Sequence, residues 1–402
     1  MAKSAVTTSD LLGVGKLGIS AAIGVTNIVE QMHRTISRRP MPVGPPIVEP
    51  AGGVAGLVYE GVRKSFGLAG FGFDALLKVL GPPMEGPISR KRAVALAALN
   101  GVVGDTLVAT NNPLAIASRL RIGGRSLIME RSALAAAIPE ASSRVVVFVH
   151  GLCMSDLQWT RKGHDHGLAL EKDLGVTSIY LNYNSGLHVS ENGRAFADLL
   201  ETLVAEWPVP VEDLVIVGHS MGGLVARSAC YYGDLAGHAW RVASLHALVF
   251  LGTPHHGAPL ERIGSWVDAA ISAVPYSAAF NRLGRIRSAG ITDLRYGNLL
   301  DEDWHGRERF SLEGDNRTHA YLPSGVVCYA LAATAAKDAG GLADKAFGDT
   351  LVPVPSALGL HRDPRLILDI SADRQRVVSD TSHLDILSSA EVYDTLKTWL
   401  GG

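Results

Sequence analysis

The sequence predicts an α/β fold: a mainly parallel β-sheet with helices on both faces. After about residue 123, short apolar runs rich in β-branched residues alternate with stretches of helical periodicity. This alternation is typical of a parallel sheet that is covered on both faces. The composition, with 47% hydrophobic and 19% charged residues over 402 positions, is that of a globular chain long enough for more than one core.

The apolar runs define the expected strands. A helix with one apolar face is expected from about Glu191, between the second and third of these runs. The last strand has two candidate positions, 365–370 and 376–379. The other expected strands are 144–150, 177–183, 214–217, 245–251 and 325–332.

The sequence changes character near Gly123. Residues 1–123 are rich in Ala, Gly and Leu and predict a helical N-terminal region with Pro/Gly breaks, whereas 124–402 predict a catalytic domain. Within that domain the strand–helix alternation stops at about 259–322, and an insertion of this size predicts a helical cap, or lid, over the site. An apolar stripe from Val25 to Ile36 predicts a helix that packs on the catalytic domain, with a helix that lies on lipid as peripheral membrane contact or covers the mouth of the site as the alternative. A homodimer through the N-terminal helices is a further alternative.

Charge and cysteine usage exclude several classes of function. The formal net charge of −2 provides no basic field for nucleic acid. The three cysteines have neither metal-ligand spacing nor the pattern of a disulfide framework. No apolar stretch reaches the ~20 residues of a membrane span, and no convincing cleavage site follows the apolar segment at 17–25. We therefore expect a cytoplasmic location.

The segment Gly218-His219-Ser220-Met221-Gly222 fits the pattern G-x-S-x-G between an expected strand and an expected helix. In this context the serine lies on a strained turn that lifts its hydroxyl out of the sheet, and glycines are needed where a side chain would clash. The N–H of Met221 would then face a developing oxyanion. His150-Gly151-Leu152 ends the first long strand, where a second oxyanion donor is expected, and Leu152 N–H is the candidate.

A serine nucleophile requires a base, and the base requires an orienting carboxylate. His383 follows the last expected strand and is the candidate base, whereas His255 and His256 come earlier and are expected to line the pocket or brace their loop. Asp349 follows the expected strand 325–332 and is the candidate acid. The alternative acids are Asp344, Asp373, Asp380 and Asp385.

Five segments in this order resemble the lipase and esterase branch of the α/β-hydrolase superfamily. They are VVFVHGLCMSD, VIVGHSMGGLVAR, VFLGTPHHGAP, GDTLVPVPSA and SHLDIL, and the chain is similar to bacterial lipases and to the inositol-deacylase-like group. The resemblance implies an α/β-hydrolase fold with Ser220 as nucleophile, Asp349 as acid, His383 as base, and Leu152 and Met221 as oxyanion donors. Some such lipases bind calcium beside an acid placed like Asp385, but no partner ligand is evident, and neither a cofactor nor a metal ion is expected.

The expected function is cleavage of carboxylic esters, as by a carboxylesterase or lipase, through an acyl-enzyme on Ser220. The same residues would serve a hydrolase of thioesters, amides or polyesters. A non-catalytic binding protein built on a hydrolase fold is the remaining alternative. The expected partner is a small-molecule or lipid ester.

Overall fold

The computed structural model describes residues 90–259, 263, 288–307, 315–336 and 348–401. Residues 90–106 and 116–402 form one compact unit, and residues 1–89 and 107–115 form another. The expected helix at 25–36 and most of the expected cap, including Trp266, Tyr276 and Phe280, lie outside the described residues.

The described part of the larger unit is built on a sheet of eight strands in the order β2-β1-β4-β3-β5-β6-β7-β8. Neighbouring strands are parallel along the row β4-β3-β5-β6-β7-β8, whereas β1 is antiparallel to both β2 and β4. The strands are β1 (Arg119–Ile122), β2 (Arg125–Ser126), β3 (Arg144–Val149), β4 (Thr177–Asn182), β5 (Asp213–His219), β6 (Leu245–Leu251), β7 (Val327–Ala333) and β8 (Gln375–Val378).

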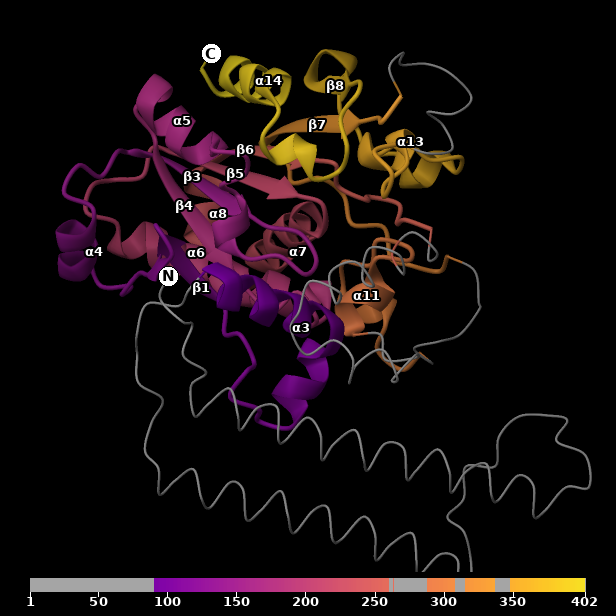
Figure 1. Ribbon diagram of the computed structural model, residues 1–402, viewed down its shortest axis with the longest axis horizontal. Coiled ribbons are helices and arrows are strands. Elements are labelled where there is room, and N and C mark those ends of the chain that lie inside the picture. Colours follow the sequence, from indigo (N-terminus) through magenta and orange to yellow (C-terminus); the bar gives the residue numbers. More distant parts are fainter. Residues whose placement is uncertain (1–89, 260–262, 264–287, 308–314, 337–347, 402) are drawn as a thin grey trace, which may run out of the picture. The chain divides into compact units, whose positions relative to one another are not determined.

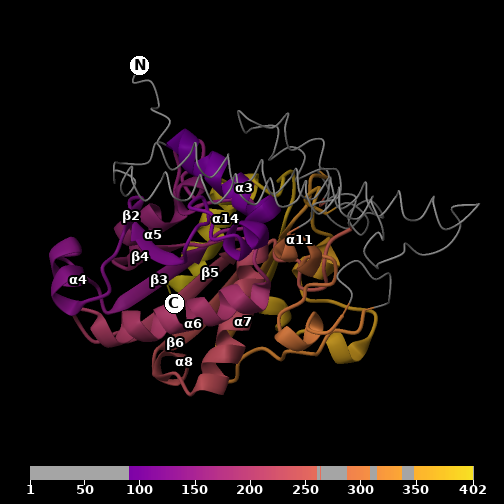
Figure 2. The same cartoon turned by 90° about the horizontal axis from the view of Figure 1, so that it is seen from below.

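Helices cover both faces of this sheet (Figure 1). Seen from below, α6, α7 and α8 lie together on one side, while α5 and α14 lie on the other (Figure 2). The helices are α3 (Arg90–Ala109), α4 (Arg131–Ala137), α5 (His166–Leu174), α6 (Val189–Glu206), α7 (Met221–Ala236), α8 (Ala239–Ala243), α11 (Ala289–Asp293), α13 (Val354–Ala357) and α14 (Ala390–Leu400).

Alternation along the strands explains the two-sided core. Phe148 and Val217 face one cluster together with Leu170 of α5 and Leu396 of α14. Because successive strand residues point to opposite faces, their buried neighbours along β3 and β5 face α6 and α7 instead. Strands buried on both faces need continuous apolar runs, which is why these runs were visible in the sequence.

The fold class predicted from the sequence is confirmed. The last strand, β8, occupies the second of its two candidate positions, and Pro364–Leu366 is a 3-10 turn. The prediction of helices throughout 1–123 missed β1, and Gly123 lies in the β1–β2 turn with φ 53°. β1 is only four residues long, carries two arginines and forms hydrogen bonds at the antiparallel end of the sheet, so it lacks the apolar run of a central strand.

Glycines on α3 allow this helix to approach the chain that follows β3 and β4. A Cβ on Gly101 would lie 2.3 Å from the Cys153 sulfur, and one on Gly104 would lie 1.9 Å from Asn184 Oδ1. Asn184 Nδ2 donates to Gly104 O at 3.1 Å. No helix within the described ranges is both long and apolar enough to cross a bilayer.

Candidate active site

Ser220 lies on a tight turn between β5 and α7. Its φ of 55° and ψ of −127° are unusual for a residue with a side chain. A Cβ on Gly218 would lie 2.5 Å from the Cα of Gly223, and one on Gly222 would lie 2.1 Å from the carbonyl oxygen of Val149. The two glycines of the pattern are therefore required by close backbone approach, as the sequence predicts.

His383 and Asp349 form a buried pair. Nδ1 of His383 lies 2.6 Å from Oδ2 of Asp349, and both side chains are almost fully buried. The other carboxylate oxygen accepts the N–H groups of Leu351 and Val352 at 3.0 and 2.8 Å. The main chain adds a further link, because His383 N donates to Asp349 O at 3.0 Å. The carboxylate is thus fixed on both oxygens and holds the histidine with its Nδ1 protonated.

Several contacts bring the Ser220 turn and the His383–Asp349 pair to the same edge of the sheet. Ser220 N donates to the carbonyl oxygen of Leu251, the last residue of β6. A Cβ on the next residue, Gly252, would lie 3.2 Å from Asp349 Oδ2 and 3.4 Å from His383 Cε1. His219, the residue before Ser220, donates from its Nε2 to His383 O at 3.0 Å. Burial lowers the pKa of His219 well below its usual value, so this ring braces the His383 loop in its neutral form.

The two predicted oxyanion donors flank Ser220. Met221 is the first residue of α7, where N–H groups have no partner within the helix. Leu152 is buried and follows Gly151, and a Cβ on Gly151 would lie 3.0 Å from the Cβ of Ser220. The chain that carries Leu152 N–H therefore passes directly beside the serine.

The alternative acids differ from Asp349 in their surroundings. Asp385 lies 2.8 Å from Lys162 Nζ and accepts the Ser382 hydroxyl at 2.7 Å. These partners lower the pKa of Asp385 to about 2. Asp373 and Asp380 are exposed, and Asp344 lies outside the described residues. Among the residues searched, which are those that the structure describes, His, Cys, Asp and Glu form no group suited to a metal ion.

His255 and His256 are engaged by two arginines. His255 is buried, and its Nδ1 accepts from Arg227 at 3.3 Å. Nδ1 of His256 accepts from Arg317 at 2.7 Å. Burial is the main cause that lowers the pKa of His256, to about 3, so the ring is neutral. Both histidines hold the loop after β6.

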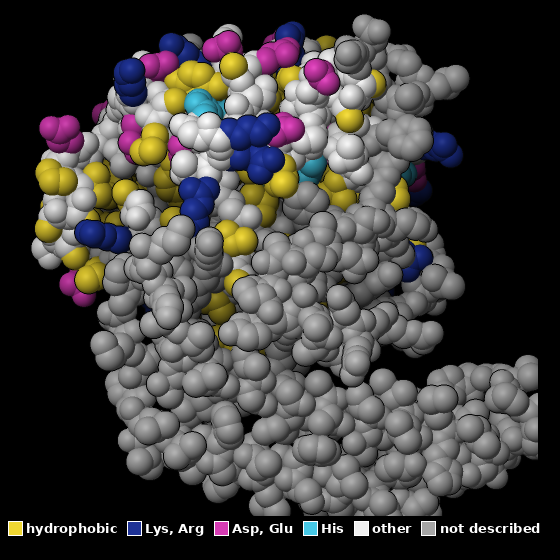
Figure 3. Space-filling view, in the orientation of Figure 1, with side chains coloured by type: hydrophobic (Ala, Val, Ile, Leu, Met, Phe, Trp, Pro, Cys, Tyr) yellow, Lys and Arg dark blue, Asp and Glu magenta, His cyan; other side chains and the backbone are white. Residues whose placement is uncertain are grey.

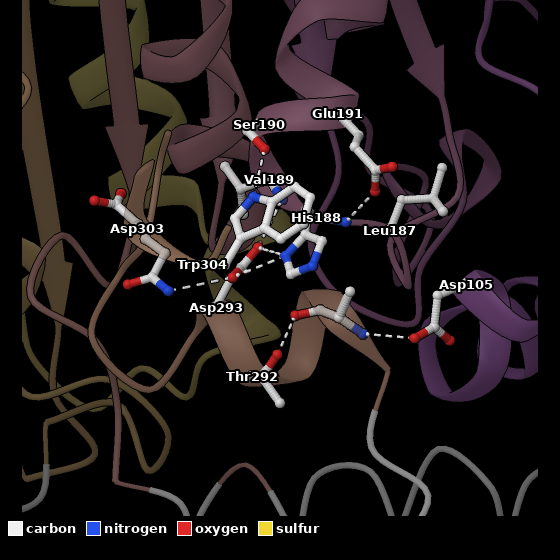
Figure 4. A network of polar contacts seen from close by, with 12 residues as sticks. Asp105, Leu187, His188, Val189, Ser190, Glu191, Thr292, Asp293, Asp303 and Trp304 are labelled. Carbon is white, nitrogen blue, oxygen red and sulfur yellow. Dashed lines mark hydrogen bonds and ion pairs between the residues drawn. The ribbon is translucent and has the colours of Figure 1, made fainter. Parts of the chain in front are cut away.

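A polar cluster that the sequence did not reveal lies at the start of α6 (Figure 4). His188 Nδ1 lies 3.0 Å from Asp293 Oδ2, and Val189 N donates to the same oxygen at 2.9 Å. The His188 ring stacks on Trp304 with centroids 3.8 Å apart, and Trp304 Nε1 donates to Ser190 Oγ at 3.0 Å. Asp293 and Trp304 belong to the described part of the expected cap, so the cluster ties this part to the start of α6. The sequence placed a histidine after β4 but gave no sign of its partner more than 100 residues away.

The described surface carries charges of both signs. On the face shown in Figure 3, Lys and Arg side chains are interspersed with Asp and Glu. This distribution agrees with the formal net charge of −2.

Part of the larger unit is similar to a known protein family. Residues 140–325 match the family model of the PGAP1-like alpha/beta domain. The described part of the larger unit has the α/β-hydrolase fold. The resemblance predicted from the sequence motifs is thereby confirmed. None of the curated proteins matches the chain.

The chain is similar in structure to several solved proteins at low sequence identity. One is the mature lipase BlEst2 from Bacillus licheniformis, with 16% identity, a TM-score of 0.40, and coverage of 64% of this chain and 91% of that one. Another is the Pyrococcus furiosus esterase Pf2001, with 15% identity, a TM-score of 0.35, and coverage of 65% and 85%. A third is the phospholipase PlaB from Legionella pneumophila, with 18% identity, a TM-score of 0.32, and coverage of 53% and 44%.

Proposed function

We propose that this α/β hydrolase cleaves carboxylic esters through an acyl-enzyme on Ser220. The observation that carries the proposal is the buried His383–Asp349 pair, with 2.6 Å between Nδ1 and Oδ2, on the sheet edge where Ser220 lies on its strained turn. A histidine held by a carboxylate through Nδ1 has its Nε2 available as a base in the neutral form.

The reaction proceeds in two halves. His383 Nε2 removes the hydroxyl proton as Ser220 Oγ attacks the ester carbonyl carbon. The oxyanion then accepts hydrogen bonds from Leu152 N–H and Met221 N–H, and the alcohol leaves with the proton that His383 holds. Water repeats the sequence on the acyl-enzyme, which releases the carboxylic acid and restores the serine.

Asp349 stabilises the imidazolium form of His383 in each half-reaction. Two backbone N–H groups and the histidine satisfy the oxygens of this carboxylate. Its role is to orient the ring and to balance its charge, and it takes no proton.

A serine-directed probe and ester substrates test the proposal together. We expect a fluorophosphonate to label the wild-type chain and to leave Ser220→Ala unlabelled. The matched control is Ser228→Ala, because Ser228 is a buried serine on the same helix whose hydroxyl donates to Leu299 O at 2.7 Å. Ser228→Ala should retain labelling, whereas labelling of Ser220→Ala, or none of the wild type, would contradict the proposal.

The acyl bond is identified by a series of p-nitrophenyl esters of increasing chain length, with a thioester and an anilide as comparison. Ester turnover should exceed that of the other two and should fall at least about 10³-fold in Ser220→Ala. Faster turnover of the thioester or anilide would instead assign this serine to another class of acyl bond. A stable wild-type chain that neither labels nor turns over any of the three would favour a binding protein.

A further inference from the structure

The residue after Leu152 has a backbone conformation that needs support. Cys153 has a φ of 60°, in the left-handed region that residues with a side chain rarely adopt. Its backbone N–H donates to the hydroxyl oxygen of Ser185 at 3.0 Å, and both residues are buried. Such a conformation persists only where neighbouring groups hold it. The Ser185 hydroxyl, three residues beyond β4, therefore helps to fix the chain directly after the proposed oxyanion donor.

The side chain of Cys153 is a packing group. A Cβ on Gly101 of α3 would lie 2.3 Å from the Cys153 sulfur and 2.9 Å from the Cys153 nitrogen, so this helix contacts the residue closely. Burial raises the pKa of the thiol to about 12, so the thiol stays protonated and is a poor nucleophile. The place of Cys153 beside Leu152 thus matters through its backbone, which Ser185 holds.

The peptide unit that carries Leu152 N–H is fixed through its carbonyl group. His150 Nδ1 donates to Gly151 O at 2.9 Å. Burial lowers the pKa of His150 to about 4, so the ring is neutral, and its Nε2 accepts the N–H of Tyr183 at 3.4 Å. This contact places the ring proton on Nδ1. Because the carbonyl and the N–H of a trans peptide point in opposite directions, Leu152 N–H points away from the His150 ring.

Residues 183–185 brace both ends of the segment 150–153, which we call the oxyanion loop. At one end, Tyr183 Oη donates to His150 O at 2.7 Å, and the two rings stack with centroids 4.3 Å apart. At the other end, Ser185 accepts the N–H of Cys153. β3 and β4 are parallel neighbours, so the segments that follow them leave the sheet at the same edge. The peptide unit with Leu152 N–H therefore lies between two supported ends.

We infer that Ser185 is a positioning residue for the proposed oxyanion hole: its hydroxyl holds Cys153, and through it the N–H of Leu152, in the orientation that a tetrahedral intermediate requires. Ser185 acts through the backbone of the oxyanion loop and takes no proton in the reaction. The inference rests on the function proposed for Ser220.

Loss of the Ser185 hydroxyl should affect the transition state more than the bound ester. In Ser185→Ala, the N–H of Cys153 would lack its acceptor in a buried position, and rotation of Cys153 out of the left-handed region would turn the neighbouring peptide units. A donor of an oxyanion hole is effective only when it lies about 2.7–3.1 Å from the oxyanion. The ester before attack depends far less on this donor, so kcat should fall while KM stays nearly unchanged.

Steady-state kinetics on the p-nitrophenyl ester that the wild type cleaves fastest measures this effect. The kcat of Ser185→Ala should fall about 10–100-fold, with KM within about threefold of the wild-type value. Ser190→Ala is the matched control. Ser190 is also a buried serine whose hydroxyl accepts an N–H, but its donor is Trp304 Nε1, at 3.0 Å, in the described part of the expected cap. Ser190→Ala should keep kcat within about twofold of the wild type.

A reversible trifluoromethyl ketone with the acyl chain of that ester adds a readout that a general loss of stability does not move. Its adduct with Ser220 carries an oxyanion, so its inhibition constant should rise at least about tenfold in Ser185→Ala and stay within about twofold in Ser190→Ala. If Ser185→Ala does not fold, Ser185→Cys takes its place, because a thiol is a weaker acceptor, and kcat should then fall at least about threefold.

The outcomes separate this inference from the proposed function. A folded Ser185 variant with the kcat and the inhibition constant of an active wild type would overturn the inference and leave the function proposed for Ser220 intact. Equal losses of kcat in Ser185→Ala and Ser190→Ala would also overturn it, because they would indicate a general loosening of the fold. A wild-type chain that neither labels with a fluorophosphonate nor cleaves an ester would contradict the proposed function, and this inference with it.

Discussion

At the scale of single residues, the turn at Ser220 combines strain with close packing. A positive φ costs an L residue about 1–2 kcal/mol, and this cost is sustained because β5, α7 and β6 fix the chain on all sides. Ser220 N–H is held by Leu251 O, and Gly223 N–H by Ser220 O. Strain of this kind places the hydroxyl above the sheet, where a substrate carbonyl can reach it.

Gly222→Ala tests whether close approach is what fixes the turn. The added methyl would lie 2.1 Å from Val149 O, which is backbone and cannot rotate away. We expect a loss of more than about 3 kcal/mol in unfolding free energy in urea, or failure to fold. Gly237→Ala is the control: its φ of 70° carries strain, but no atom lies within 4 Å of the added carbon. It should lose only about 1 kcal/mol, and equal losses in the two variants would contradict the packing argument.

A pair of aspartates tests the assignment of the acid. Asp349→Asn should lower kcat about 10³–10⁴-fold, because an amide can neither hold the correct histidine tautomer nor balance its charge. Asp385→Asn changes an aspartate two residues from the histidine that pairs with Lys162 and Ser382 instead. It should leave kcat within about twofold of the wild type. A larger loss in Asp385→Asn than in Asp349→Asn would reverse the assignment.

The sequence alone predicts Ser220 as the nucleophile more strongly than it predicts Asp349 as the acid, for a physical reason. A strand, a serine between glycines and a helix are contiguous, so local sterics reveal the turn. The Asp349–His383 pair spans 34 positions and depends on how two loops meet after β7 and β8. Chain order narrowed the candidate acids, but only the three-dimensional contacts distinguish a carboxylate that faces the histidine from one that pairs with a lysine.

At the scale of elements, the strands that could be predicted carry the signal in their own residues. The strands that could not be predicted are placed by contacts with distant segments. β3, β5 and β6 lie in the middle of the sheet and need uninterrupted apolar runs. β1 and β2 are short and antiparallel, and they carry the exposed residues Arg119 and Arg125. Their position is set by pairing with β4, which leaves little trace in their own residues.

The cluster around Asp293 predicts how α11 is held. Asp293 is 1% exposed and accepts hydrogen bonds from His188, Val189 N–H and Asn298. Asp293→Ala would leave these donors without their acceptor and should cost about 2–4 kcal/mol in urea unfolding. Asp198→Ala is the control: its side chain is 76% exposed, and we expect a change below about 0.5 kcal/mol.

Trp304 provides a local readout of the same variant, because its ring stacks on His188. Loss of the Asp293 carboxylate frees the His188 ring to turn. The tryptophan fluorescence of the folded Asp293→Ala chain, measured before the unfolding transition, should therefore differ from that of the wild type. A native baseline that is identical to that of Asp198→Ala, with no loss of stability, would show that the cluster does not hold α11.

At the scale of the whole molecule, several histidines are buried in neutral form. Burial is the main cause that lowers the pKa of His150 and His166 to about 4 and that of His256 to about 3, from an ordinary value of 6.5. His150 directly follows β3, His166 is the first residue of α5, and His256 lies in the loop after β6. Because they lie in different parts of the fold, we expect their titration to change the stability of the whole domain. Their neutral rings accept and donate specific hydrogen bonds, such as that between His166 Nε2 and Ile386 O.

The sign of the resulting pH dependence follows from proton counts. Below about pH 6.5 the unfolded chain binds a proton at each of these histidines, whereas the folded chain does so only near pH 4 or below. Stability should therefore be constant near neutrality and fall as the pH drops from 6.5 towards 4, by up to about 1.4 kcal/mol per pH unit for each histidine. Asp385, with its pKa of about 2, adds its own loss of stability only below about pH 4.

Urea unfolding between pH 7.5 and 4.5 measures the slope of stability against pH. His166→Gln should reduce the slope by the contribution of one histidine, because glutamine retains a donor but does not titrate. His305→Gln is the control, since His305 is exposed and should leave the slope unchanged. A wild-type stability that rises on acidification, or a slope that is the same in His166→Gln as in the wild type, would show that these buried histidines do not set the acid limit of the fold.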